Sequence, residues 1–173
     1  MSVGQTSTAA VQGAAAFAWL HAQAPPSDWT RASIPDGAVL PIPPGWKRES
    51  GDANTATAVL RDSNGQLIGY LNATPRENAE APATWAAFRV HHNAGEGDSN
   101  VREEAAAQGL HFRGGRGSCV KDRYETITQE EYIELACLLA GAKTSAVIVA
   151  AAPPDSWAQL APRLERAVSS FSA

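Results

Sequence analysis

The chain has 173 residues, a length that fits a single domain. Its 14 basic and 18 acidic residues give a net charge of −4, which argues against a dedicated nucleic-acid-binding protein, because such proteins usually carry a strong positive excess. No run of roughly 20 strongly apolar residues is present, so the sequence predicts no transmembrane segment. We predict one domain over residues 1–173, with residues 1–35 as an N-terminal helix and loop extension.

The first predicted element is an alanine-rich helix. Residues 6–8 can cap a helix that runs to about Ala22, and Pro25 and Pro26 would end it. The same stretch is similar to a secretory signal, but the first basic residue is Arg31, so the positively charged leading region is missing. We interpret it as an amphipathic helix. The lost N-terminus of a larger or membrane-anchored precursor stays an alternative.

The clearest local pattern predicts a β-hairpin. Residues 55–61 and 66–74 flank the turn sequence DSNG at residues 62–65. Asn-Gly is favoured in tight hairpin turns because both residues accept positive φ. A short extended run over residues 38–42 precedes this hairpin, and Trp46, which follows a Pro-Pro-Gly break, is expected to close one end of the sheet.

Two helices are predicted after this hairpin. Between residues 83 and 92, Trp85 and Phe88 fall on one helical face, and His92 follows at a spacing of four. A second short helix is predicted over residues 101–108. It would end at Gly109, which can adopt the left-handed conformation of a helix cap.

The last third of the chain predicts a second hairpin, one more strand and a final helix. Residues 118–127 and 131–139 form the hairpin, and the β-branched run at 146–151 fits a strand at the centre of the sheet. A helix over residues 156–170 carries its apolar residues on one face. Together these elements predict an α+β fold, with an antiparallel sheet of about five to seven strands covered by helices and a helix at each end of the chain.

The two cysteines lie on the two strands of the second hairpin. A turn centred on Thr128 places Cys119 opposite Cys137, and opposed cysteines can be bridged when their β-carbons lie within about 3.5–4.5 Å. A one-residue change of register would instead place Val120 opposite Cys137 and leave two buried thiols. A bulge near the glycines at 114–117 would reconcile the two patterns. The residues alone leave these alternatives open.

Three groups of polar residues are candidate sites. The weak candidates for metal ligands are His91, His92 and His111. They are weak because the adjacent His91 and His92 would point about 100° apart on a helix. A possible anion-binding patch beside flexible glycines consists of Arg113, Arg116, Lys121 and Arg123. Four acidic residues lie in predicted loops: Glu77, Glu80, Glu96 and Asp98. We expect them to be solvated and assign them no acid–base role. The sequence contains no recognisable catalytic motif and predicts no cofactor.

Several segments match one known fold in order. These are residues 42–46 (IPPGW), the antiparallel hairpins, the strand at 146–151, and Trp157 leading through an amphipathic helix to residues 170–171. In this pattern the chain resembles the PsbP-like fold of a photosystem II extrinsic subunit, a Ran-binding nuclear-import factor and several bacterial envelope lipoproteins. Its cysteine-containing segments are similar to those of uncharacterised bacterial envelope proteins with paired cysteines.

The resemblance has implications for the cysteines and for function. It favours the Cys119–Cys137 disulfide, and thus an extracytoplasmic location over a cytoplasmic one. It implies a non-catalytic binding or assembly module of the bacterial cell envelope that recognises a protein partner or an apolar, lipid-like ligand. The alternatives are a histidine-dependent enzyme or metal-binding protein, and a structural subunit that docks through its N-terminal helix.

Overall fold

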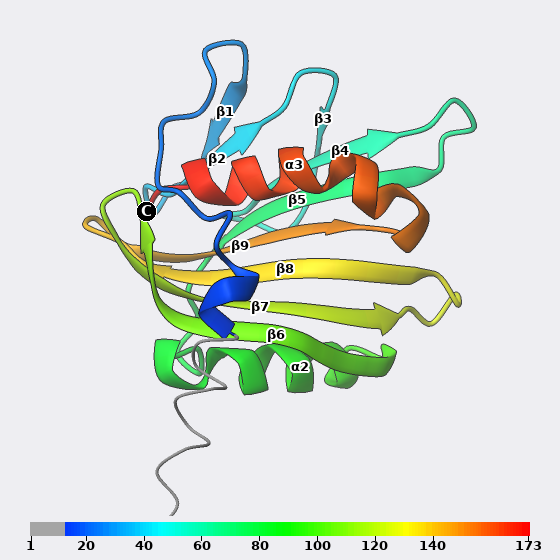
Figure 1. The fold of residues 1–173 in the computed structure, drawn as a ribbon. Coiled ribbons are helices and arrows are strands. Elements are labelled where there is room, and N and C mark those ends of the chain that lie inside the picture. The colour runs from blue at the N-terminus through cyan, green and yellow to red at the C-terminus, as the bar shows by residue number, and fades with distance from the viewer. Residues whose placement is uncertain (1–12) are drawn as a thin grey trace, which may run out of the picture.

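The computed structural model describes residues 13–173. A seven-stranded antiparallel sheet forms the body of the molecule (Figure 1). In sheet order, its strands are β3 (Lys47–Glu49), β4 (Ala56–Arg61), β5 (Leu67–Pro75), β9 (Ser145–Ala152), β8 (Glu131–Ala140), β7 (Gly115–Glu125) and β6 (Ser99–Phe112). The predicted α+β fold with an antiparallel sheet of five to seven strands is confirmed.

The sheet consists of two meanders that meet at its middle. The chain runs from β3 to β5, crosses through the 3₁₀ turn η1 (Pro82–Thr84) and helix α2 (Trp85–Gly95), and enters β6 at the far edge. It then returns strand by strand until β9 pairs with β5. Strand β9 is therefore the central strand, as predicted, and its residues 146–152 are all buried, since it has a neighbouring strand on each side and helix α3 packs on one face.

The turn between β4 and β5 has the tight conformation that its sequence predicts. Gly65 has a φ of 78°, and one carboxylate oxygen of Asp62 accepts hydrogen bonds from the backbone N–H groups of Asn64 and Gln66, both at 2.9 Å. Further along β5, Gly69 lies under the indole of Trp46. A β-carbon at position 69 would be 2.6 Å from Cη2 of that ring, so only glycine permits this contact.

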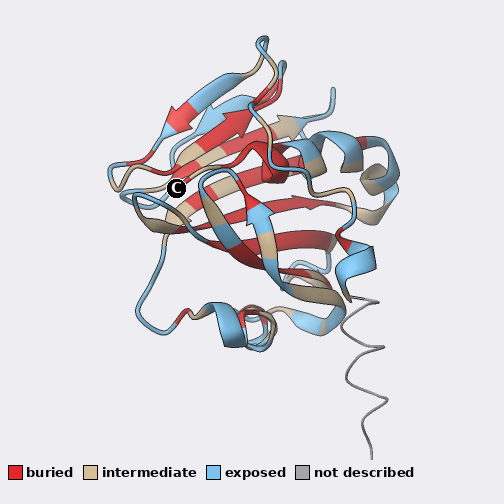
Figure 2. Cartoon of the chain, turned by 60° about the vertical axis from the view of Figure 1, so that its left-hand side comes forward, coloured by how far each residue is buried: buried red, intermediate tan, exposed pale blue. Residues whose placement is uncertain are grey.

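The larger core lies on one face of the sheet. Helix α3 (Pro154–Ser170) packs there beside a small sheet of β1 (Thr30–Ser33) and β2 (Val39–Ile42). Figure 2 shows the buried interior between these layers. The helix residues that enter this core are Leu160, Leu164, Ala167 and Val168, as its periodicity predicts.

The opposite face carries a smaller core beneath α2. Trp85 is 1% exposed, and its indole N–H donates to the carbonyl oxygen of Ala136 at 2.8 Å. Helix α2 packs mainly against β6 and β7, at one side of the sheet (Figure 1). Among residues 13–173, no helix covers the same face of β5 and β9.

Two predicted helices differ from the structure. Residues 101–108 lie in β6, because pairing with β7 overrides the helical propensity of an Ala- and Glu-rich segment. Gly109 has a φ of 66°, but it belongs to a bulge between Ala107 and Leu110 and caps no helix.

The N-terminal helix is also shorter than predicted. Residues 13–16 are helical and residues 17–19 form a turn, whereas the predicted start at residues 6–8 lies outside the described residues. The expected end at Ala22 is wrong, because the chain there leaves the helix to contact α3: the N–H of Gln23 donates to the carbonyl oxygen of Ser169 at 3.1 Å.

The second hairpin has the register centred on Thr128. Cys119 lies directly opposite Cys137, and the two form a disulfide. The alternative register with Val120 opposite Cys137 is therefore wrong. Lys121 lies on the same face of β7 as Cys119, but this face is not open to solvent. The ammonium of Lys121 lies 5.3 Å from the ring centroid of Trp157 on α3, which covers it.

A candidate binding groove beside helix α2

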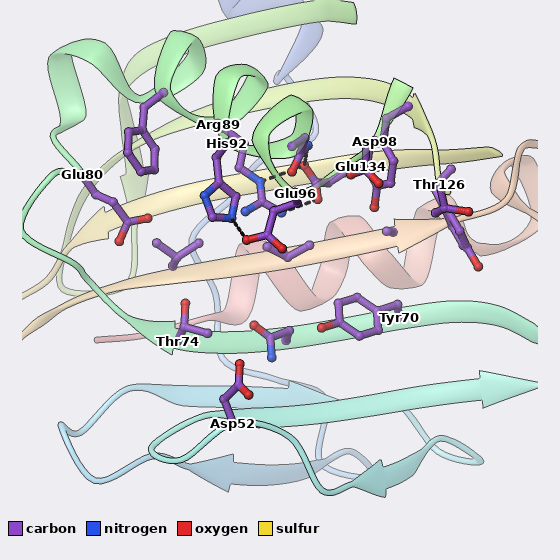
Figure 3. A pocket seen from close by; sticks show the side chains of 18 of the residues that line it. Asp52, Tyr70, Thr74, Glu80, Arg89, His92, Glu96, Asp98, Thr126 and Glu134 are labelled. Carbon is purple, nitrogen blue, oxygen red and sulfur yellow. Dashed lines mark hydrogen bonds and ion pairs between the residues drawn. The ribbon is translucent and has the colours of Figure 1, made fainter. Parts of the chain in front are cut away.

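A groove of about 600 Å³ lies over the part of the sheet that α2 leaves open (Figure 3). Strands β5 and β9 form its floor, and their register aligns the side chains in three transverse rows. The pairs in these rows are Tyr70 with Ala151, Asn72 with Val149, and Thr74 with Val147. The floor is thus apolar along β9 and polar along β5.

Aromatic rings of α2 form one wall of the groove. Phe88 stacks on His92 with ring centroids 5.9 Å apart, and Trp85 stacks on Phe88 at 6.0 Å. The spacings of three and four residues place these rings on one face of the helix. Trp85 is covered by the sheet, whereas Phe88 and His92 line the groove.

A buried charge network fixes α2 to the sheet at one end of the groove. Glu134 on β8 is 0% exposed and receives two hydrogen bonds from Arg89 of α2, from Nε to Oε2 at 3.0 Å and from Nη2 to Oε1 at 2.6 Å. The register places Glu134 opposite Asp122, which is also fully buried. The side-chain amide of Asn93 donates to both carboxylates, at 3.2 Å each.

The two buried carboxyl groups have opposite protonation states. Burial, then the charge of Glu134 and a hydrogen bond with it, raises the pKa of Asp122 to about 9, so Asp122 is protonated near neutral pH. Burial also acts to raise the pKa of Glu134, but the charge and hydrogen bonds of Arg89 lower it overall. The network therefore contains one carboxylate and one guanidinium, and it adds no net charge to the groove.

The rim of the groove is acidic. Besides the Arg89-paired Glu134, five acidic residues line it: Asp52, Glu77, Glu80, Glu96 and Asp98. Because Arg89 is paired with Glu134, His92 is the remaining basic group, and its Nε2 lies 3.4 Å from Oε1 of Glu96. The groove thus has a negative potential along its opening.

One of these acids is not solvated as expected. Glu80 is only 7% exposed, and its Oε1 accepts a hydrogen bond from the N–H of Glu77 at 2.6 Å. Burial raises its pKa. Burial, followed by the charge of Glu134, likewise raises the pKa of Asp98 at the other end of the groove. Burial thus disfavours the charged form of both groups, although the charges of Arg89 and His92 act in the opposite direction.

The predicted histidine candidates are not brought together. His91 is exposed on α2, His111 is exposed on β6, and only His92 lines the groove. Within residues 13–173, no group of three or more His, Cys, Asp or Glu side chains is arranged to hold a metal ion.

The four residues of the possible anion patch are spread along β7 and its preceding turn. Arg113 and Arg116 are exposed near the turn. Lys121 lies 3.6 Å from Glu104, and Arg123 donates to Glu104 at 3.0 Å and also contacts Glu131. Half of the patch is thus already paired with acids, and anion binding there stays a prediction.

Sequence reasoning missed the buried network of Arg89, Asn93, Asp122 and Glu134. One signal for it was present. Glu134 alternates with apolar residues in a strand, and a turn centred on Thr128 pairs it with Asp122. Two acids opposite each other in a buried hairpin require a cation or a proton, and α2 supplies the cation.

Comparison with known proteins identifies the architecture. No protein-family model matches the chain, and no curated protein matches its sequence. Among solved structures, CyanoP, the cyanobacterial PsbP of Synechocystis, matches with a TM-score of 0.59 at 16% identity, over 84% of this chain and 92% of that one. The chain has the PsbP-like fold.

Two further structures share the PsbP-like fold with this chain. LpqN, which is involved in cell envelope biogenesis of Mycobacterium tuberculosis, matches with a TM-score of 0.51 at 13% identity, over 84% of this chain and 91% of that one. PA94 of Pseudomonas aeruginosa, a protein of unknown function and putative regulator, matches with a TM-score of 0.54 at 11% identity. The match covers 84% of this chain and 96% of that one. Across the described residues, no helix is long and apolar enough to cross a membrane.

Proposed function

We propose that this PsbP-like chain is a non-catalytic binding module of the bacterial cell envelope, and that it holds a protein partner in the groove beside α2. The observation that carries the proposal is the uncovered face of β5 and β9, which forms an open groove of about 600 Å³ with an aromatic wall. Concave sites of this size with a partly apolar lining and a few polar groups are typical of ligand binding.

The envelope location is supported by two separate observations. The Cys119–Cys137 disulfide fits an oxidising compartment, since such bonds are rare in the cytosol. The fold is also that of LpqN, which is involved in cell envelope biogenesis. The likeness is one of fold, so the location of this chain is part of the proposal.

The groove favours a protein partner over a lipid-like ligand. Its five acidic residues other than the Arg89-paired Glu134 would repel the phosphate or carboxylate head groups of anionic lipids. The groove is also not an enclosed apolar cavity, the kind of site that shields an acyl chain from water. A polypeptide segment can instead place an apolar side chain against the partly buried ring of Phe88 while its backbone stays near water.

Site-specific photo-crosslinking in cells of the native host tests the proposal. A benzoylphenylalanine at Thr74, on the groove floor, should crosslink to a protein, whereas the same group at Gln159, exposed on α3, should not. Thermal melting of each purified variant establishes that the fold is retained. Equal crosslinking at the two positions, a crosslink to lipid alone, or none at position 74 would contradict a protein site in the groove.

Fractionation of the same cells tests the location. The proposal expects the chain outside the cytoplasm with Cys119 and Cys137 oxidised. Because both are buried in the fold, alkylation is carried out in denaturant, where both should resist it until a reductant is added. A cytoplasmic pool with both thiols free would contradict the envelope assignment.

A further inference from the structure

We infer that the groove binds an extended basic segment of its partner, with two Lys or Arg residues about four positions apart and an apolar residue between them. This inference rests on the proposed function, because it specifies what the protein partner presents to the same groove. It follows from the charges at the two ends, the distance between them and the floor that joins them.

Carboxyl groups that form no ion pair within residues 13–173 lie toward both ends of the groove. Glu80 lies at the Thr74 end of β5 and Asp98 toward the Tyr70 end, whereas Glu96 lies between them beside His92 (Figure 3). The groove contains no lysine, and its arginine is bound to Glu134. Complementary charge in a partner would therefore have to enter at two separate places.

Glu80 is the most specific of these groups. Its carboxylate belongs to a side chain that is 7% exposed, and it points into the groove (Figure 3). Oε1 accepts a hydrogen bond from the N–H of Glu77, and no hydrogen bond within residues 13–173 uses Oε2. Oε2 is not among the fully buried atoms that lack a partner, so it is open to the groove. An accessible carboxylate oxygen on an otherwise buried side chain can accept a strong hydrogen bond from an ammonium or guanidinium group.

The spacing follows from the floor. Along β5 the two ends are four residue steps apart, from Tyr70 to Thr74, which is about 13 Å at the rise of an antiparallel strand. An extended ligand of the same pitch brings its own residues n and n+4 to the two ends. A helical ligand would span only about 6 Å over the same interval and would leave one acid unpaired.

The middle of the groove has an apolar side. Its floor is the row of Asn72 and Val149, and the stacked rings of Phe88 and His92 form the wall beside it. An apolar side chain between the two cations can be buried on this surface, which gives the ligand a contribution that high salt does not screen. The combination distinguishes the inferred ligand from any polycation attracted by the charge of the rim.

The test uses the full chain and three capped seven-residue peptides. The first has lysines at its second and sixth positions and leucine at its fourth, with alanine elsewhere. The second has the same composition but adjacent lysines, and the third has glutamine in place of both lysines. Binding is measured by chemical-shift titration of the ¹⁵N-labelled chain at low salt. We expect signals of β5, β9 and α2 to shift, and the first peptide to bind roughly tenfold more tightly than the second.

Charge variants locate the contacts. Glu80→Gln should weaken binding of the first peptide roughly fivefold to tenfold, and Asp98→Asn should weaken it less because Asp98 is more exposed. The matched control Glu165→Gln removes the same charge from α3, on the other face of the sheet, and should leave binding unchanged. Equal affinity for the first two peptides would overturn the inferred spacing. An equal loss in the variants at positions 80 and 165 would overturn the inferred site.

The inference and the proposed function can fail separately. Mass spectrometry of the crosslink formed at position 74 identifies the captured segment. A segment without basic residues would overturn the inference and leave the protein-binding function standing. The absence of any crosslinked protein would remove the proposed function itself.

Discussion

Replacing Asp122 by asparagine is expected to flatten the pH dependence of folding stability. In the native chain, burial beside Glu134 raises the pKa of Asp122 to about 9. In the unfolded chain this group has an ordinary aspartate pKa of about 3.9. Between these values the native state binds one more proton than the unfolded state. The stability that Asp122 contributes is therefore complete at low pH and is lost as the pH rises toward 9.

The size of the effect follows from this one proton. While Asp122 is protonated in the native state and ionised in the unfolded state, the free energy of unfolding falls by about 1.4 kcal/mol per pH unit. Over two pH units near neutrality this amounts to about 2.7 kcal/mol. Glu80 and Asp98, whose pKa values are also raised, act in the same direction, but they are present in both proteins and cancel in the comparison.

Urea unfolding followed by tryptophan fluorescence at several pH values measures the difference. The asparagine keeps the shape of Asp122, so Glu134 and Arg89 can retain their pairing. Wild type should lose stability relative to Asp122→Asn as the pH rises, and Asp28→Asn, in an exposed loop, should give curves parallel to wild type. Parallel curves for Asp122→Asn would refute a protonated Asp122 in the native state.

Two further predictions concern the sheet. Replacing Cys119 and Cys137 together by alanine should lower the free energy of unfolding by about 3 kcal/mol, because the bridge closes a loop with a sequence separation of 18; an unchanged urea midpoint would contradict this. Gly69→Ala should cost about 1–3 kcal/mol in the same assay, because the new β-carbon would meet Trp46, whereas Gly95→Ala, with open space around it, should be neutral or stabilising. Equal stabilities for the two alanine variants would argue against the Trp46 contact.

The disagreement at residues 101–108 illustrates where local patterns fail. This segment contains Glu, Ala and Gln, which favour a helix, and it has no apolar alternation that would indicate a strand. It is the outer strand of the sheet, and its three register shifts break the two-residue period. The free energy of backbone pairing with β7 decides its conformation, and a sequence pattern does not contain that contribution.

The acidic groove was beyond sequence reasoning for a related cause. Glu80 and Asp98 are loop residues 18 positions apart, and nothing in either local sequence distinguishes them from solvated acids. They come to one groove because α2 spans the distance between the β5 and β6 ends while covering only one side of the sheet. The position of a helix across a sheet depends on the packing of rings such as Trp85, so it is a tertiary property.

By itself, the sequence determined the features that depend on neighbouring residues or on a single turn. The DSNG hairpin, the central strand, the apolar face of α3 and the symmetric spacing of the cysteines about Thr128 belong to this group. Only the tertiary structure decided which acids are buried, which one is neutralised by Arg89, and which surface stays open for a partner. Burial and pairing depend on atoms distant in the chain, whereas turns and periodicity depend on residues close to one another.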